Sequence, residues 1–321
     1  MGIIDITNII NSAPSVKKEP KLLSLGIKQF LEKEFPLREF ILAPVIPTQG
    51  LVMIYAPRGI GKTFVSLSIA CSVAAGEDMF DGKWVCEKPR KVLFVDGEMP
   101  ASALQERLAG IISSMENKVD FSENLTVITQ DLQELGIADL SSIDGQKHIE
   151  EHLEGVELLI LDNLSSLCRS GRENESESWL PLQEWLLTLR RRSISVLLVH
   201  HAGKNGNQRG NSKKEDLLDT VIALKKPDRY TPSEGARFEV HYEKARGFYG
   251  EEAKAFEACL TKNANSLKWE AKEVEDHLMQ KAHDLVNQGY SQRQAASELG
   301  ISKSAFNRQY NNYKNQYTEE A

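Results

Sequence analysis

The chain has 321 residues, of which 41% are hydrophobic and 26% charged, and its formal net charge is −7. This composition is that of a globular protein with room for one large domain and a small one. The sequence shows no apolar stretch near the roughly 20 residues that span a bilayer and no secretion signal, so we expect a cytoplasmic protein. The acidic charge argues against a protein that coats nucleic acid over its whole surface, but not against local basic patches.

The four cysteines are scattered along the chain without CxxC spacing. This pattern excludes a zinc ribbon and suits reduced thiols in a cytosolic protein. The residues are Cys71, Cys86, Cys168 and Cys259.

In chain order, residues 1–19 are polar and irregular, 22–35 have apolar residues at helical spacing, and the loop 43–50 carries two prolines and a glycine. From residue 51, short apolar runs alternate with helical patterns, which indicates a mostly parallel, twisted sheet covered on both faces. In such a sheet, ligands bind at the carboxyl ends of the strands. The predicted strands are 51–56, 91–97, 125–129, 156–162 and 195–201, and the predicted helices 62–75, 101–118, 145–153 and 177–192.

The pattern changes after residue 219. Four runs, at 219–226, 236–246, 255–261 and 266–272, predict antiparallel strands at short spacing, and from residue 273 the chain reads as purely helical. We therefore predict an N-terminal arm and helix (1–42), a large α/β domain (43–272) and a small all-α domain (273–321).

The stretch APRGIGKT (56–63) follows an apolar run and opens a predicted helix. It fits the phosphate-binding loop pattern, in which backbone N–H groups surround a phosphate, Lys62 reaches the β and γ oxygens, and Thr63 binds Mg²⁺. A glycine-rich turn without a ligand is the alternative. The predicted nucleotide-binding residues are Ala56, Pro57, Arg58, Gly59, Ile60, Gly61, Lys62, Thr63 and Phe64.

Acidic residues follow two of the other predicted strands. VELLILDN runs straight into Asp162, which we interpret as the acid that orders Mg²⁺, with a helix cap as the alternative. In KVLFVDGEMP, Asp96 and Glu98 come at the end of a strand, where a carboxylate can polarise an attacking water molecule. We favour Glu98 as this base, although Asp96 could serve instead, or either could be a turn residue.

A phosphate loop, an acid after the next strand and an apolar run ending in aspartate resemble the RecA-like ATPases. FVDGEMPASALQERL and LLVHHAGK are similar to the plasmid RepA-type hexameric helicases, and the resemblance covers roughly residues 40–250. It implies a RecA-like core, ATP with Mg²⁺, and a homo-oligomeric ring, expected to be a hexamer. It also implies that His200 and His201 sense the γ-phosphate, against the alternative of ordinary histidines at a strand end.

Two basic stretches extend the resemblance. NQRGNSKKEDLLD resembles a basic loop that faces the ring's pore and touches nucleic acid, which would involve Lys204, Arg209, Lys213 and Lys214; a solvated lysine-rich loop is the alternative. EKARGF resembles a K-x-R pattern whose basic pair enters the neighbouring subunit's site and stabilises charge in the transition state. Lys244 and Arg246 would then act in trans, unless they are an exposed charged strand end.

The tail, 289–315, has helix-turn-helix spacing and resembles the DNA-binding domains of transcriptional regulators and resolvases. A serine begins each of two helices, Gly300 lies at the turn, and Lys303, Asn307 and Arg308 on the second helix suit a major groove. Docking to a protein is the alternative. The predicted small core consists of Ala295, Ala296, Leu299, Ile301 and Phe306.

Together these features predict an ATP-hydrolysing ring that works on DNA as a helicase or translocase of a mobile element. A DNA-binding switch or loader, which would use ATP without unwinding, is the main alternative. A small-molecule phosphotransferase would leave the histidines and the K-x-R pattern unexplained.

Overall fold

The computed structural model describes residues 22–35, 37–116, 120–169, 179–203, 216–227, 230–263, 266–274 and 277–317. The chain divides into two compact units, Met1–Leu37 and Arg38–Ala321. The described part of the first unit contains one short helix, α2 (Ile27–Glu32). It is shorter than the helix predicted at 22–35, because Gly26 and Lys33 on either side of it have extended backbone.

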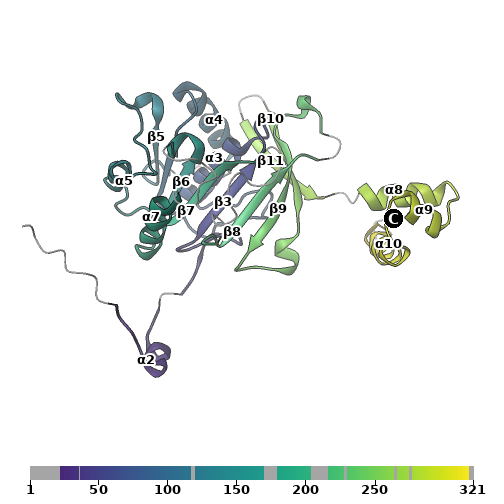
Figure 1. Ribbon diagram of the computed structural model, residues 1–321. Helices are drawn as coiled ribbons and strands as arrows, with labels where there is room; N and C mark the ends of the chain where they lie inside the picture. The colour runs from purple at the N-terminus through teal and green to yellow at the C-terminus, as the bar shows by residue number, and fades with distance from the viewer. Residues whose placement is uncertain are drawn as a thin grey trace, which may run out of the picture. The chain divides into compact units, whose positions relative to one another are not determined.

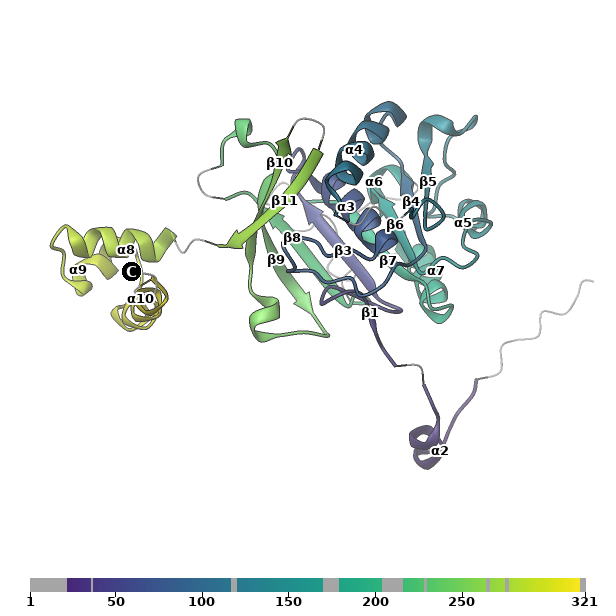
Figure 2. The same cartoon turned by 180° about the vertical axis from the view of Figure 1, so that it is seen from behind.

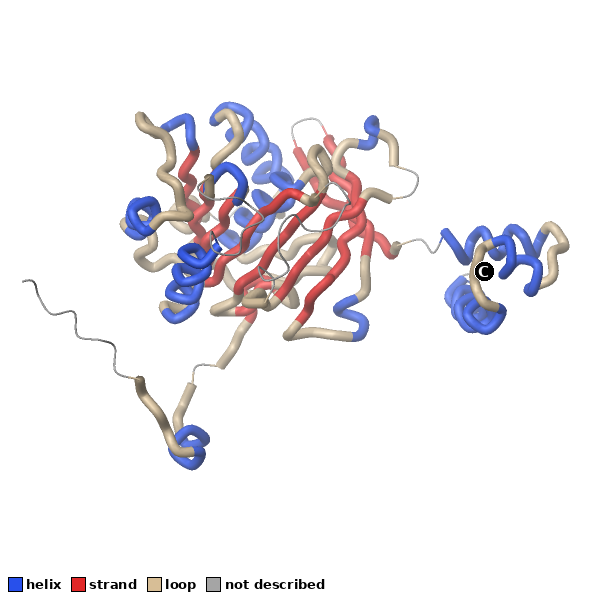
Figure 3. Tube along the Cα trace, in the orientation of Figure 1, coloured by secondary structure: helices blue, strands red, loops and turns tan. Residues whose placement is uncertain are grey.

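The second unit is built on a nine-stranded sheet in the order β11-β10-β9-β8-β3-β7-β6-β4-β5 (Figure 1). Six strands pair in parallel and three antiparallel strands continue the sheet at one edge. The strands are drawn in red in Figure 3. The parallel strands are β3 (Leu51–Ala56), β4 (Val92–Asp96), β5 (Leu125–Thr129), β6 (Leu158–Asp162), β7 (Ser195–His201) and β8 (Thr220–Lys225). The antiparallel ones are β9 (Arg237–Ala245), β10 (Phe256–Asn263) and β11 (Ser266–Glu273), and a separate pair consists of β1 (Phe40–Leu42) and β2 (Ile46–Pro47).

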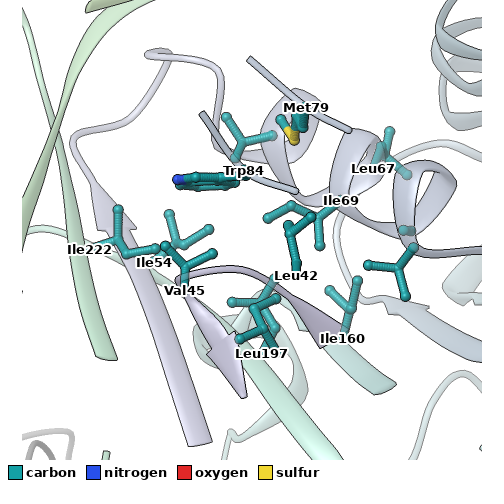
Figure 4. Packing of buried hydrophobic residues seen from close by; sticks show 14 of the residues in the cluster. Leu42, Val45, Ile54, Leu67, Ile69, Met79, Trp84, Ile160, Leu197 and Ile222 are labelled. Atoms are coloured by element: carbon teal, nitrogen blue, oxygen red, sulfur yellow. The ribbon is translucent and has the colours of Figure 1, made fainter. Parts of the chain in front are cut away.

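Side chains of the parallel strands alternate between two cores. Val52 and Ile54 face one core, whereas Leu51, Met53 and Tyr55 face the other, as the period of two in a strand requires. Helices α3 (Lys62–Ala75) and α4 (Ala101–Ser114) cover the first face (Figure 2), whose packing around Trp84 is shown in Figure 4. Helices α5 (Ile143–Glu150), α6 (Leu164–Leu167) and α7 (Leu180–Arg191) cover the second.

This architecture confirms the predicted fold class. Strands β3, β5 and β7 and helix α3 have the predicted bounds. One prediction is wrong: the run 219–226 was expected to be antiparallel, but β8 pairs in parallel with β3 and is antiparallel only to β9. Residues Thr220 to Leu224 are all buried, which is the pattern of a strand covered on both faces inside a parallel sheet. Within the described ranges, short 3₁₀ helices lie in connections at Gln130–Leu132, Pro232–Glu234 and Gly250–Ala253.

The C-terminal helices are α8 (His277–Asn287), α9 (Gln292–Glu298) and α10 (Lys303–Tyr317), and they pack around a core of their own. The hydroxyl of Ser291 accepts an N–H bond that begins α9, the hydroxyl of Ser302 accepts one from Ala305, and Gly300 between the helices has φ of 66°. The five predicted core residues all belong to this cluster, together with Met279, Ala282 and Tyr310. None of the helices in the described ranges is long and apolar enough to cross a membrane.

Candidate nucleotide-binding site

The glycine-bearing loop leaves the buried strand β3 and ends where α3 begins. Gly59 and Gly61 have φ of 75° and 111°, a region that glycine enters without the steric cost of a side chain. Gly61 has a second constraint, because a Cβ there would lie 2.8 Å from the Cβ of Ala236. The loop therefore takes its shape from its glycines and lies directly against the segment that precedes β9.

Lys62, the first residue of α3, is held inside the loop. Its Nζ donates hydrogen bonds to the backbone oxygens of Ala56 (3.1 Å) and Pro57 (3.0 Å), and only 7% of the residue is exposed. Burial lowers the pKa of Lys62, while the nearby carboxylates of Asp162 and Glu98 act in the opposite direction. The loop thus concentrates a cation at the start of a helix, where N–H groups also favour a bound phosphate.

Asp162, the last residue of β6, is almost fully buried beside the start of α3. Its Oδ2 accepts a hydrogen bond of 2.7 Å from the hydroxyl of Ser66, and the side chain of Thr63 also hydrogen-bonds to it. Burial raises the pKa of Asp162, and the bonds from Ser66 and Thr63 lower it. Thr63 and Asp162 therefore present a hydroxyl and a carboxylate together, a donor set that suits Mg²⁺, which takes the rest of its ligands from water and phosphates.

The two acids after β4 have different surroundings. Asp96 is 1% exposed, and its Oδ2 accepts backbone N–H bonds from Glu98 (3.3 Å) and Met99 (2.8 Å). Burial raises the pKa of Asp96 to about 6. Glu98, with 60% of its side chain exposed, accepts a hydrogen bond from Nδ2 of Asn163 and has His201 Nε2 at 3.8 Å from its Oε2. Asp96 thus holds the turn, whereas Glu98 reaches the pocket.

These residues surround a pocket of about 760 Å³. Of the predicted residues, the structure brings together in its lining Arg58, Gly59, Gly61, Lys62, Thr63, Phe64, Glu98, Asp162 and His201. Ala56 and Pro57 contribute the carbonyl groups that hold Lys62. Ile60 is buried in the hydrophobic core and His200 is 1% exposed, and neither lines the pocket.

Several lining residues were not predicted from the sequence. Arg107 of α4 lies 4.3 Å from the ring centroid of Phe64, and its Nη1 donates to the sulfur of Met99. Burial lowers the pKa of Arg107, while the charges of Asp162 and Asp96 raise it. Helical spacing could have indicated this residue, because Pro100, Ala103 and Arg107 share one face of a helix that begins next to Glu98.

Most of the other missed residues come from a distant part of the chain, the segment just before β9, which forms one wall of the pocket: Tyr230, Pro232, Gly235 and Ala236. The exception is Asn163, which directly follows the predicted Asp162. No local sequence signal marks the segment 230–236, since it reaches the loop only through the pairing of β8 with β3 and β9.

Lys244 and Arg246 lie at the opposite end of the sheet. Lys244 pairs with Val221 and Ala245 with Thr220, at the start of β8, and Thr220 in turn pairs with Val52 near the start of β3. Lys244 Nζ and Arg246 Nη2 lie 3.5 and 2.8 Å from the backbone oxygen of Asp216. The pocket occupies the carboxyl end of β3, so this basic pair is not part of the pocket of its own chain.

The predicted nucleic-acid-binding residues fall into two groups. Lys204, Arg209, Lys213 and Lys214 lie outside the described residues. Lys303, Asn307 and Arg308 lie on α10, with Lys303 and Arg308 exposed and Asn307 partly buried.

Comparison with known proteins relates this geometry to a family. Residues 17–207 match the AAA domain family. A KaiC-like protein of the hyperthermophilic archaeon Pyrococcus horikoshii OT3 is a similar solved structure, with 16% identity, a TM-score of 0.47, and coverage of 70% of this chain and 90% of that one. No curated protein sequence matches the chain. Because the match spans more than half of the sequence and contains the loop, Glu98, Asp162 and His201, this chain belongs to the AAA domain family.

Proposed function

We propose that the protein is an ATP-hydrolysing ring ATPase that moves along or unwinds DNA for a plasmid, prophage or other mobile element. The observation that carries the ATPase part is the convergence of Lys62, Thr63, Glu98 and Asp162 on one pocket. A phosphate loop, a Mg²⁺-ordering acid and a water-polarising carboxylate are the parts that phosphoryl transfer to water requires.

In this proposal each side chain has a defined task. Lys62 would bind the β and γ oxygens of ATP. Thr63 and Asp162 would hold Mg²⁺, which would supply positive charge to the phosphates. Glu98 accepts a proton from the attacking water, since its carboxylate is exposed to the pocket while that of Asp96 is occupied by backbone N–H groups. His201, whose Nε2 lies 3.8 Å from Oε2 of Glu98, would sense the γ-phosphate.

The position of Lys244 and Arg246 supports a site shared between subunits. Lys244 pairs with Val221 near the amino end of β8, and Arg246 lies just beyond that end, opposite the pocket of their own chain. A cation aimed at the transferring phosphoryl group stabilises charge that develops in the transition state. We infer that ATP binds between neighbouring copies in a ring, as the resemblance to hexameric helicases implies, with this basic pair supplied by the neighbour.

We further propose that residues 273–321 form a DNA-binding helix-turn-helix domain that follows the ATPase domain (43–272) and the arm (1–42). Capped helices, the turn at Gly300 and a separate small core support it. Lys303 and Arg308 are exposed on α10, where they could meet phosphate or a base edge. Replacing both by alanine should weaken duplex binding and flatten its salt dependence by about 0.9 in log–log slope for each phosphate that is no longer neutralised. Unchanged affinity across a salt series would instead favour a protein-docking role.

The C-terminal helices also favour a second candidate, a DNA-binding switch or loader that uses ATP without unwinding. One experiment separates the two candidates: ATP hydrolysis is measured with and without single-stranded DNA, alongside strand displacement on a forked duplex. Stimulated hydrolysis with displacement supports a helicase. Hydrolysis or ATP-dependent DNA binding without displacement supports the switch, and a protein that hydrolyses no ATP in any condition would overturn the proposal.

A further inference from the structure

A second pocket, of about 440 Å³, shares no lining residue with the nucleotide pocket. Its walls come from the second half of α3, the turn at 76–82, the C-terminal end of α4, and β11. Figures 1 and 2 show α3, α4 and β11 together on this side of the sheet. Its volume lies within the range typical of small-molecule sites.

Hydrogen bonds between the walls fix the shape of this pocket. Trp269 Nε1 of β11 donates to the hydroxyl of Ser68 on α3 (2.8 Å). The hydroxyl of Ser114 on α4 donates to the backbone oxygen of Leu267 (2.7 Å), and Asp81 Oδ2 accepts from the backbone N–H of Ala271 (2.7 Å). Each wall is therefore tied to β11, and the pocket is formed before any ligand arrives.

Two serine hydroxyls on α3 lie in this pocket with hydrogen-bonding capacity to spare. Ser68 and Ser72 are one helical turn apart and are 4% and 7% exposed. The hydroxyl of Ser68 accepts a bond from Trp269, and that of Ser72 makes no hydrogen bond to any described residue. The hydroxyl of Ser72 can therefore accept a hydrogen bond from a ligand N–H group in the pocket.

The charge of the lining is negative. Glu77, Asp78, Asp81 and Glu116 line the pocket against one lysine, Lys268, whose Nζ lies 3.8 Å from Glu116. Helix α3 ends at Gly76 in the same lining, and a helix C-terminus adds partial negative charge. The remaining lining is largely apolar and includes Met79, Phe80, Ile111, Met115, Leu267 and Trp269.

We propose that this pocket binds a small organic cation, an ammonium or guanidinium group on an aliphatic stem. The stem packs against the apolar lining, the cationic head meets the carboxylates, and an N–H of the head donates to the hydroxyl of Ser72. The ligand is either a free polyamine or a lysine or arginine side chain of another protein, and the two share this chemistry.

The test titrates the full-length protein with three probes in a calorimeter at low salt: spermidine, N-acetyl-lysine amide, and 1-pentanol as a neutral stem. We expect at least one cationic probe to bind and pentanol to bind at least about tenfold more weakly, since pentanol cannot form a charge-assisted hydrogen bond. Tighter binding of spermidine identifies a free polyamine, and tighter binding of the lysine amide identifies a side chain. Failure of both cations to bind at millimolar concentration would overturn the proposal.

Variants locate the binding. Ser72→Leu fills the pocket and should weaken binding of the cationic probe at least about tenfold. Ser113→Leu, an exposed change on α4 outside the lining, is the control and should leave the affinity unchanged. Glu77→Gln with Glu116→Gln removes two charges of the lining and should weaken binding and flatten its salt dependence, with the melting temperature measured alongside. Equal affinity in the double charge variant and the wild type would show general attraction to an acidic surface and reject the site.

Discussion

The two ends of β9 lie at opposite ends of the neighbouring parallel strands, one at their carboxyl ends and the other at their amino ends. Just before its start, Ala236 lies against the glycine loop and lines the nucleotide pocket. At its other end, Lys244 lies beside the amino end of β8 and Arg246 just beyond it. The length of β9, 9 residues or about 30 Å, separates Ala236 from Arg246. The start of β9 thus lies at the pocket of its own chain, whereas its end holds Lys244 and Arg246 away from that pocket. A site shared between subunits in a ring would need this arrangement.

The variant with the largest expected effect tests the nucleotide pocket at the carboxyl ends of the parallel strands. Lys62→Ala removes the buried cation of the loop, and we expect ATP hydrolysis to fall below detection in a steady-state phosphate-release assay. Lys83→Ala, an exposed lysine outside the pocket, is the matched control and should retain wild-type turnover. Normal hydrolysis by Lys62→Ala, with an unchanged melting temperature, would mean that the loop does not bind the phosphates.

Glu98→Gln tests the proposed catalytic base in the same pocket. Glutamine keeps the size and an acceptor for Asn163 but lacks the charge that draws a proton from water, so turnover should fall at least about a hundredfold while ATP binding persists. Glu106→Gln, exposed on α4, controls for a change of charge nearby. Near-normal turnover would move the role to Asp96 or elsewhere.

Mixing inactive variants tests the opposite end of β9. Arg246→Ala lacks the trans cation and Lys62→Ala lacks the phosphate loop lysine, so mixed rings would contain some interfaces with both intact halves and recover part of the activity. Lys62→Ala mixed with Glu98→Gln is the control, because both changes damage the same half and no intact site can form. Absence of recovery in the first mixture, with co-assembly demonstrated, would argue against shared sites.

The smallest expected effect concerns stability. Burial raises the folded-state pKa of Asp96 to about 6, above its ordinary value of 3.8, so its charge destabilises the fold increasingly as pH rises from about 4 to about 6. Asp96→Asn removes this penalty and keeps an acceptor for the N–H of Met99. We expect the variant to gain about 1–3 kcal/mol in unfolding free energy at pH 7.5 and about a third of that gain at pH 4.5. Urea unfolding without nucleotide measures this, and an equal gain at both pH values would contradict it.

The sequence was most informative where local patterns decide structure. Apolar runs placed β3, β5 and β7, and the glycines of the loop located the start of α3. It gave no indication of the direction of β8, since an apolar run buried on both faces looks the same in either direction. Arg107 and Tyr230 enter the pocket through tertiary packing, and no local pattern records that. The catalytic roles of Glu98, His201, Lys244 and Arg246 stay predictions that the variants above address.

The placement of β3 between β7 and β8 has a consequence for how the chain is made. Val52 pairs with Leu197 on one side and Thr220 on the other, so a growing chain has the glycine loop long before it has either neighbour of the strand that carries it. Contacts so distant in sequence form slowly, and unpaired strand edges are prone to aggregate in the meantime. The nucleotide pocket can therefore be completed only after Ala236 has left the ribosome, because β8 and the segment 230–236 must both be present.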